Sequence, residues 1–346
     1  MGQVELNSMT LEELKEYMKY LGEKGFRGEQ IFTYFHKNKE VDITQLQVLP
    51  KKLRNKLFKK EIINKTSILE RLDSNIDDTS KYLFLLEDKN IVEGVFMRYP
   101  HGVSVCISTQ VGCKMGCRFC ASTKGGLVRN LTPAEMVNQI YLMERDMGVD
   151  INNIVLMGSG EPLDNYDNVI KFLNIIHDSK GHNISYRNIT LSTCGIVPEI
   201  YDLADEGLPI TLSISLHSPF NKARSKMMPI SRTYNISNLI DACIYYEKAT
   251  NRRVSFEYTL IEGVNDKKED AEKLSHLLKD LKSHVNLIPL NPIKEYNKER
   301  PELNSLKRFK EMLGTYNVNT TIRQEKGLDI NASCGQLRRD YLNKSN

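Results

Sequence analysis

The amino-acid sequence predicts an α/β fold, a partial (β/α)6-type TIM barrel preceded by a small helical segment and a β-hairpin. Three observations lead to this prediction. Strand-like and helix-like segments alternate between residues 103 and 325, the pattern of parallel strands joined by helical crossovers. Residues 1–70 show helical signals only. The 346 residues, 40% apolar and 27% charged, suffice for one large globular domain and a smaller one.

Residues 1–70 are expected to form a helical accessory domain. Thr10 and Glu13 suit a capping box, and apolar residues then recur at helical spacing, at Leu14, Met18 and Leu21. Two further helices are predicted over 27–35 and 51–58. The segment 51–60 holds six basic residues in ten. Such a run is usually a solvated helix face, and the alternative is a surface that contacts RNA phosphates.

Residues 71–102 are expected to form a β-hairpin extension. The runs 82–86 and 91–97 are strand-like, and the polar residues 87–90 between them suit a turn.

The barrel core is expected over residues 103–325, followed by a C-terminal loop over 326–346. The predicted strands are 103–107, 153–157, 188–192, 210–216, 254–260, 285–289 and 319–323. About six strand–helix units favour a barrel over a doubly wound open sheet. One helix start is well marked, because Thr132, Pro133 and Glu135 supply an N-cap, a proline at the first position and a capping-box glutamate. In such a barrel, catalytic and ligand-binding residues gather at the C-terminal ends of the strands.

Charge and cysteine content restrict the function. The net charge of +4 permits a polyanionic partner without demanding one. Seven cysteines in a chain with no export signal indicate metal binding or catalysis in the reducing cytoplasm, not a disulfide framework. No apolar run approaches the roughly 18 residues that span a bilayer, so no membrane association is expected.

Three of the cysteines form the most informative motif. Cys113, Cys117 and Cys120 are spaced C-x3-C-x2-C in a loop directly after the first barrel strand. Iron–sulfur clusters usually have four thiolate ligands, and three would leave one iron open to an outside ligand. In radical enzymes this ligand is S-adenosylmethionine, which predicts a [4Fe–4S] cluster here. The alternative is a zinc site, with Cys106, His101 or His217 as a fourth ligand.

Polar groups follow several of the predicted strands. The turn 158–162 is rich in glycine, which lets a backbone approach a ligand, and its Glu161 can accept hydrogen bonds from an ammonium group. Ser192, the segment 215–217 and Asn291 stand at later strand ends. Each alone is more often a capping residue, but together they predict one ligand site at the barrel mouth.

These motifs resemble the RlmN type of radical S-adenosylmethionine enzyme, the dual-specificity rRNA/tRNA adenine-C2 methyltransferases. The order and spacing hold from about residue 26 to residue 337. The resemblance rests on segments 106–113, 121–126, 160–163, 215–217, 228–230, 291–292 and 332–337, together with the three cysteines. Ser159 departs from the methionine that the family often has there, and no loss of cofactor binding is expected from it.

The resemblance implies a mechanism with two further cysteines. One S-adenosylmethionine methylates Cys334, and a second, cleaved at the single cluster, removes a hydrogen atom from that methyl group. The methylene radical adds to carbon 2 of adenine 2503 in 23S rRNA or adenine 37 in tRNA. Glu93, thirteen residues before Cys106, matches the family's proton acceptor. Cys106 then attacks Cys334 and leaves a disulfide, which a reductant must reopen.

The resemblance also implies ligands and partners. The residues that match the family's contacts to S-adenosylmethionine are Gly160, Glu161, Ser192, Ser215, Leu216, His217 and Asn291. The expected partners are 23S rRNA, tRNA and an electron donor such as flavodoxin or ferredoxin, and a monomer is expected. The N-terminal helices resemble the family's RNA-binding accessory domain.

Two other functions stay open from the sequence. The first is the related C8 methylation of the same rRNA adenosine, although segment 121–126 and Pro162 look like the C2 type. The second is a zinc-stabilised RNA-binding protein without catalysis.

Overall fold

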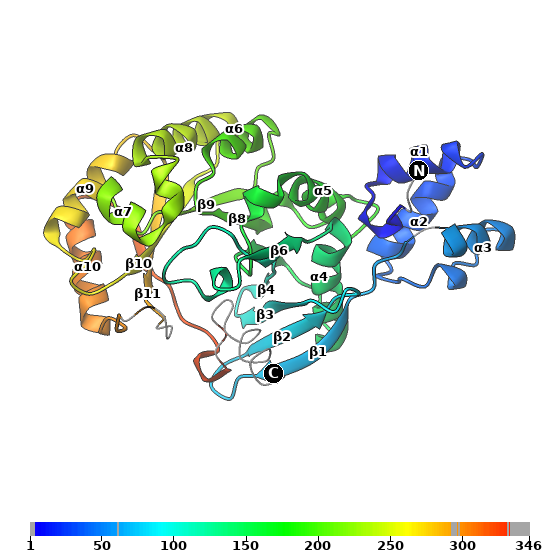
Figure 1. Ribbon diagram of the computed structural model, residues 1–346, viewed down its shortest axis with the longest axis horizontal. Coiled ribbons are helices and arrows are strands. Elements are labelled where there is room, and N and C mark those ends of the chain that lie inside the picture. The colour runs from blue at the N-terminus through cyan, green and yellow to red at the C-terminus, as the bar shows by residue number, and fades with distance from the viewer. Residues whose placement is uncertain (1–3, 61, 292–295, 297, 331, 333–346) are drawn as a thin grey trace.

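The computed structural model describes residues 4–60, 62–291, 296, 298–330 and 332. The fold class predicted from the sequence is confirmed, because a central parallel sheet is flanked by helices in a partial barrel. The barrel fills the left and centre of Figure 1, and the N-terminal helices project at the right.

Three helices form the N-terminal part, namely α1 (Leu11–Tyr20), α2 (Phe26–His36) and α3 (Lys51–Lys60). The predicted capping box begins α1. The Thr10 hydroxyl accepts from the backbone N–H of Glu13, and the Glu13 carboxylate accepts from the backbone N–H of Thr10 at 2.8 Å. Both partners thereby satisfy N–H groups that a helix start leaves without intrahelical acceptors.

The four strands that follow are antiparallel: β1 (Ser67–Asp73), β2 (Thr79–Leu85), β3 (Ile91–Tyr99) and β4 (Gly102–Cys106). The predicted hairpin is β2–β3, and β3 pairs with the first barrel strand, so the hairpin extends the barrel sheet. β1 was not predicted. It is an edge strand whose side chains are mostly exposed or half-buried, and its sequence therefore lacks a clear alternation of apolar and polar residues.

All later pairings in the main sheet are parallel, in the order β4-β7-β8-β9-β10-β11-β12. The added strands are β7 (Asn153–Leu156), β8 (Ile189–Thr193), β9 (Thr211–Ser215), β10 (Val254–Leu260), β11 (Ser283–Pro289) and β12 (Thr320–Ile322). Each lies within two residues of its predicted bounds. Among the described residues β12 pairs only with β11, so the barrel is open.

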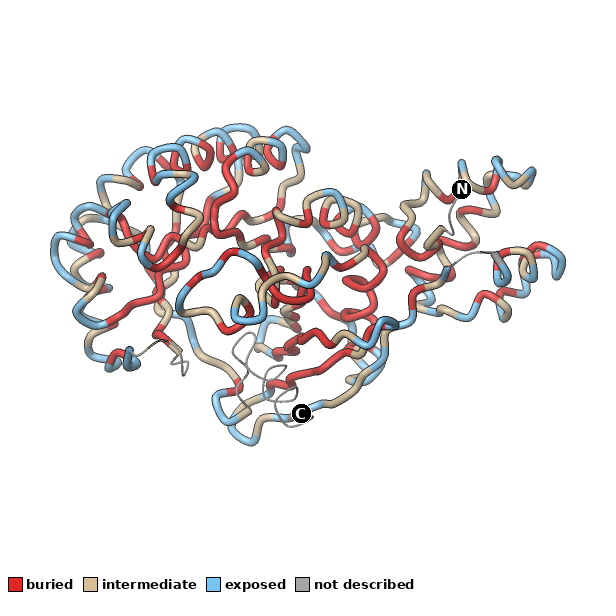
Figure 2. Tube along the Cα trace, in the orientation of Figure 1, coloured by how far each residue is buried: buried red, intermediate tan, exposed pale blue. Residues whose placement is uncertain are grey.

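Helices follow most of the parallel strands and cover the outer face of the sheet (Figure 1). They are α4 (Pro133–Met147), α5 (Tyr166–His177), α6 (Val197–Asp205), α7 (Asn221–Met227), α8 (Ile236–Thr250), α9 (Lys268–Leu278) and α10 (Leu303–Thr315). Figure 2 shows the strands buried along most of their length, with the outer sides of the helices exposed. None of the described helices is both long and apolar enough to cross a membrane.

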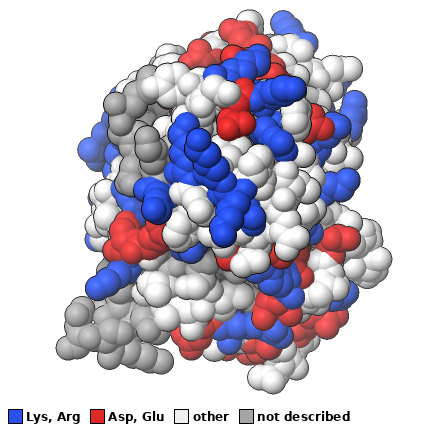
Figure 3. Space-filling view, turned by 90° about the vertical axis from the view of Figure 1, so that its right-hand side faces the viewer, with Lys and Arg blue, Asp and Glu red and all other residues white. Residues whose placement is uncertain are grey.

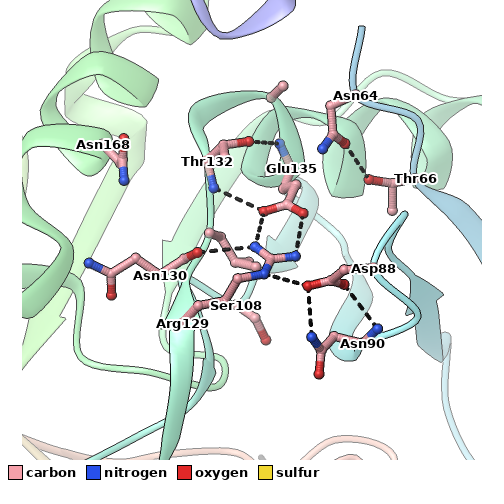
Figure 4. A network of polar contacts seen from close by, with 12 residues as sticks. Asn64, Thr66, Asp88, Asn90, Ser108, Arg129, Asn130, Thr132, Glu135 and Asn168 are labelled. Carbon is pink, nitrogen blue, oxygen red and sulfur yellow. Dashed lines mark hydrogen bonds and ion pairs between the residues drawn. The ribbon is translucent and has the colours of Figure 1, made fainter. Parts of the chain in front are cut away.

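A small ribbon of β5 (Gln110–Gly112) and β6 (Leu127–Asn130) encloses the loop that carries the three cysteines. Arg129 of β6 fastens it (Figure 4). Its guanidinium donates to both carboxylate oxygens of Glu135, at 2.7 and 2.8 Å, and to Asp88 at 2.6 Å. The ribbon is thus tied both to the start of α4 and to the β2–β3 turn, so the base of the cysteine loop has a fixed position.

Candidate active site

The three motif cysteines line one cavity of about 280 Å³ at the C-terminal ends of the barrel strands. Cys113 and Cys117 are buried, and Cys120 is partly exposed. Backbone hydrogen bonds help to hold the loop. The backbone N–H of Cys113 donates to the carbonyl of Gly126, and that of Arg118 donates to the carbonyl of Met227 at the end of α7, both at 2.9 Å.

The thiols fit a cluster better than a single ion. Among the described residues, no three His, Cys, Asp or Glu side chains lie close enough together to hold one metal ion. In a cubane each thiolate binds a different iron, so three thiols that line one cavity without converging on a single point suit it. Burial raises the pKa of Cys113 to about 12 and raises that of Cys117 as well, and coordination of iron would remove these protons.

Two glycines bring the turn after β7 against the segment that leads into the cysteine loop. A Cβ atom on Gly158 would lie 2.5 Å from the carbonyl oxygen of Ile107. Gly160 has φ of +111°, and its Cβ would lie 2.7 Å from the backbone nitrogen of Gln110. Only glycine fits either position without a shift of backbone. The buried Ser159 between them contacts Ser122 through its hydroxyl at 3.2 Å, away from the cavity wall.

Glu161 is buried in the cavity wall and held rigidly. Its two carboxylate oxygens accept from the backbone N–H groups of Leu163, at 3.1 Å, and Cys194, at 2.7 Å. Burial raises its pKa, and the hydrogen bond from Cys194 acts in the opposite direction. Among the described residues Glu161 forms no ion pair. An ammonium group in the cavity would supply the positive charge that this carboxylate lacks.

His217 follows β9 in the left-handed conformation, with φ of +55°. The side-chain amide of Asn265 holds it there by donating to its carbonyl at 2.7 Å. Its Nδ1 accepts from the backbone N–H of Thr259 at 2.9 Å, so the ring proton is on Nε2. Burial lowers the pKa of His217 to about 3, and the ring is therefore neutral near pH 7. Phe119 packs against it edge-on, with ring centres 4.8 Å apart.

All but one of the residues predicted to contact the cofactor line the cysteine cavity. Ser192, Ser215 and Asn291 line the cavity together with Gly160, Glu161 and His217. Leu216 does not line it. Its side chain is fully buried, and its backbone N–H donates to the carbonyl of Glu257.

A second cavity of about 210 Å³ adjoins the first. It is lined by Glu93 and Cys106, and it shares Met157, Gly158, Ile288, Asn291 and Arg323 with the cysteine cavity. Leu328 and Ala332 also line it. Cys334 lies outside the described residues.

Glu93 is paired with a buried lysine that the sequence did not single out. Lys81 of β2 lies 2.8 Å from the Glu93 carboxylate, and both side chains are almost fully buried. The pairing follows from register, because Leu83 is opposite Glu93 and Lys81 is its diagonal neighbour on the same face.

Two further charged residues were also missed. Glu257 of β10 and Arg323 after β12 line the cysteine cavity, and their charged groups lie 3.8 Å apart. Arg323 is common to both cavities. Arg323 stands at the end of a predicted strand, a position that could have marked it as a site residue. Glu257 lies within a strand, so its position gives no such signal.

Known proteins resemble this chain over nearly its whole length. Residues 107–275 match the profile of the radical SAM superfamily, and residues 4–63 match the ribosomal RNA large subunit methyltransferase N-terminal domain. A probable dual-specificity RNA methyltransferase RlmN of Lachnoclostridium phytofermentans is 51% identical, over 99% of this chain and 96% of that protein. Its counterpart in Alkaliphilus oremlandii is 52% identical over 99% of both.

A solved structure has the same fold. A radical SAM methyltransferase from Sphaerobacter thermophilus superposes with a TM-score of 0.90 at 41% identity, covering 96% of this chain and 98% of that one. Such a fold carries a [4Fe–4S] cluster and S-adenosylmethionine, which removes the non-catalytic zinc protein from consideration. The chain belongs to the RlmN family of radical S-adenosylmethionine RNA methyltransferases.

Proposed function

We propose that the enzyme methylates carbon 2 of adenine 2503 in 23S rRNA and of adenine 37 in tRNA, through a methyl group carried on Cys334. The observation that supports this most is the pair of adjoining cavities. One contains the three cysteines, Glu161 and His217, and the other contains Glu93 and Cys106. A radical formed in the first cavity would therefore lie next to a methyl group presented in the second.

The first cavity would bind the cofactors. Cys113, Cys117 and Cys120 would hold the cluster, which when bound supplies the electron that cleaves S-adenosylmethionine to a 5′-deoxyadenosyl radical. Glu161 would accept hydrogen bonds from the ammonium group of the cofactor. The neutral His217 would donate from Nε2. Apolar side chains such as Met115, Leu156, Met228 and Ile288 form part of the cavity wall and would limit the contact of water with the radical.

The second cavity would complete the transfer. After hydrogen abstraction from methylated Cys334, the methylene carbon bonds to carbon 2 of the adenine. Loss of the C2 proton, which Glu93 would accept, and return of one electron to the cluster, which gave one up to cleave S-adenosylmethionine, would restore the aromatic ring. The Cys106 thiolate then attacks the sulfur of Cys334, the carbon–sulfur bond breaks, and the product carbon takes a proton. The resulting disulfide needs two electrons from an external reductant.

The N-terminal helices would contact the RNA. Lys51, Lys52 and Lys59 of α3 are exposed. Figure 3 looks onto this end of the molecule, and Lys and Arg side chains gather across the middle of the face. We assign residues 1–70 to RNA binding, 71–102 to the hairpin extension, 103–325 to the catalytic barrel and 326–346 to the loop with Cys334. The enzyme would act as a cytoplasmic monomer and receive electrons from a flavodoxin or ferredoxin.

The test is anaerobic reconstitution with iron and sulfide, followed by assay on rRNA and tRNA and mass spectrometry of the nucleosides. The proposal predicts 2-methyladenosine from both RNAs, and 8-methyladenosine as the main product would contradict it. Cys334→Ala should abolish methylation. Cys106→Ala should instead accumulate a covalent protein–RNA adduct, since nothing then attacks the sulfur of Cys334. A folded Cys106→Ala enzyme that forms no adduct would count against the mechanism.

A further inference from the structure

Arg224 of α7 is a fully buried arginine next to the site, and neither the motifs nor the proposed mechanism uses it. Its guanidinium donates to three backbone carbonyls at the ends of two barrel strands. Nη2 lies 2.7 Å from the carbonyl oxygen of Cys194 and 3.0 Å from that of Ser215, and Nε lies 3.2 Å from that of Leu216. One side chain thus joins the ends of β8 and β9.

The burial of this charge needs an explanation. No ion pair among the described residues includes Arg224, and its Nη1 has no hydrogen-bond partner there. A buried cation without a counter-charge is costly, and buried donors are rarely left without acceptors. Burial lowers the pKa of Arg224, and the thiols of Cys194, Cys117 and Cys243 act in the opposite direction. Cys194, whose carbonyl accepts from Arg224, lines the same cavity as the three motif cysteines, so the missing negative charge is expected in that cavity.

Arg224 also connects the two halves of the cofactor site. The peptide group of Cys194 accepts from Arg224 at its carbonyl, and the N–H of the same residue donates to the Glu161 carboxylate at 2.7 Å. At the end of α7, the carbonyl of Met227 accepts from the N–H of Arg118, which lies between two of the motif cysteines. A shift of α7 would therefore disturb Glu161 and the cysteine loop together.

We propose that Arg224 is a positioning residue for the cofactors: it fixes the strand ends that bind S-adenosylmethionine, and its charge stabilises the reduced cluster. The inference rests on the proposed cluster site. A [4Fe–4S] core with three thiolates carries about one negative charge when oxidised and about two when reduced. A permanent cation close by favours the more negative form, so it raises the reduction potential of the cluster.

The experiment compares Arg224→Lys, Arg224→Gln and Arg224→Met with the reconstituted wild-type enzyme. Lys222→Gln, which removes an exposed charge from the same helix, is the matched control. The measurements are iron content, the cluster potential from an EPR-monitored redox titration without S-adenosylmethionine, and the Kd for S-adenosylmethionine. None of these depends on which adenine carbon is methylated, so a wrong C2 assignment would leave them unchanged.

The neutral variants should have a more negative cluster potential than the wild type. The Lys variant should keep the potential but bind S-adenosylmethionine at least tenfold more weakly, since one amine cannot reach three carbonyls. Lys222→Gln should change neither quantity. Wild-type potentials in cluster-loaded Gln and Met variants would overturn the charge effect, and wild-type affinity in the Lys variant would overturn the positioning effect.

Loss of the cluster from a variant is also decisive. The neutral variants could lose the cluster while the Lys variant retains it. If the neutral and Lys apoproteins then unfold at the same temperature, the charge is required for cluster binding and the proposal is supported. If all three Arg224 apoproteins are unfolded, Arg224 is a residue of the fold alone and the proposal fails.

Discussion

At the scale of single residues, the proposed mechanism predicts that the protonation of Cys106 sets the rate of product release. Burial raises the pKa of this thiol to about 11, and the guanidinium of Arg323 acts in the opposite direction. The thiolate is the nucleophile in disulfide formation. At pH 7 only roughly one Cys106 in ten thousand is therefore ionised.

Release of the methylated RNA should accelerate as the pH rises. Below a raised pKa the thiolate fraction grows by about tenfold for each pH unit, so decay of the protein–RNA adduct should follow this slope between pH 7 and 9. The measurement is single-turnover decay of the adduct, quenched in acid, at saturating RNA. A decay rate that does not depend on pH would contradict the prediction.

Arg323 supplies the control. In Arg323→Gln the guanidinium no longer lowers the pKa of Cys106, and the whole pH–rate curve should move to higher pH. Arg323→Lys keeps the charge and should stay close to the wild-type curve.

At the scale of elements, the turn after β7 is the part of the site most sensitive to backbone geometry. Gly160→Ala would combine a strained φ, a cost of about 1–3 kcal/mol, with a clash against Gln110. It should lower the free energy of unfolding and abolish S-adenosylmethionine binding, because the turn that carries Glu161 must move. Unfolding in denaturant and equilibrium binding measure the two effects.

Gly207 is a suitable comparison. It also has positive φ, at +64°, but an added Cβ would meet nothing within 4 Å. Gly207→Ala should cost only about 1 kcal/mol and leave binding unchanged. Equal cofactor affinity in the two alanine variants would mean that the turn does not need its glycine.

The elements and candidate site residues that could be predicted from the sequence are those whose signals are local. The cysteines, the glycine turn and the strand-end residues belong to short motifs, and seven strands were placed within two residues by their apolar character. Lys81 and Arg224 were missed because their roles arise from strand register and helix packing, which no spacing in the sequence reveals. β1 was missed because an edge strand need not alternate.

At the scale of the whole molecule, the N-terminal helices should bind the RNA, whereas the barrel should carry out the chemistry. Replacing Lys51, Lys52 and Lys59 together with alanine should raise the Kd for tRNA and rRNA fragments. It should also flatten the slope of log affinity against log salt, by about 0.7–0.9 for each lysine that contacts a phosphate. Cluster content and cleavage of S-adenosylmethionine without RNA should stay unchanged.

The matched control removes three exposed lysines at the far end of the molecule. Lys268 and Lys273 of α9 and the adjacent Lys279 lie in the barrel, away from α3 (Figure 1). Their combined replacement with alanine changes the net charge equally and should affect RNA binding much less. Equal weakening in both triple variants would indicate a general charge effect and not a binding surface.

The central claim is that the methyl carbon passes through Cys334 and loses one hydrogen atom to the radical. The most direct test supplies S-adenosylmethionine with a fully deuterated methyl group and weighs the product. Radical transfer predicts 2-methyladenosine with two deuterium atoms in the methyl group and one deuterium in 5′-deoxyadenosine. A product that retains all three deuterium atoms would mean that the methyl group moves intact, and it would contradict the account.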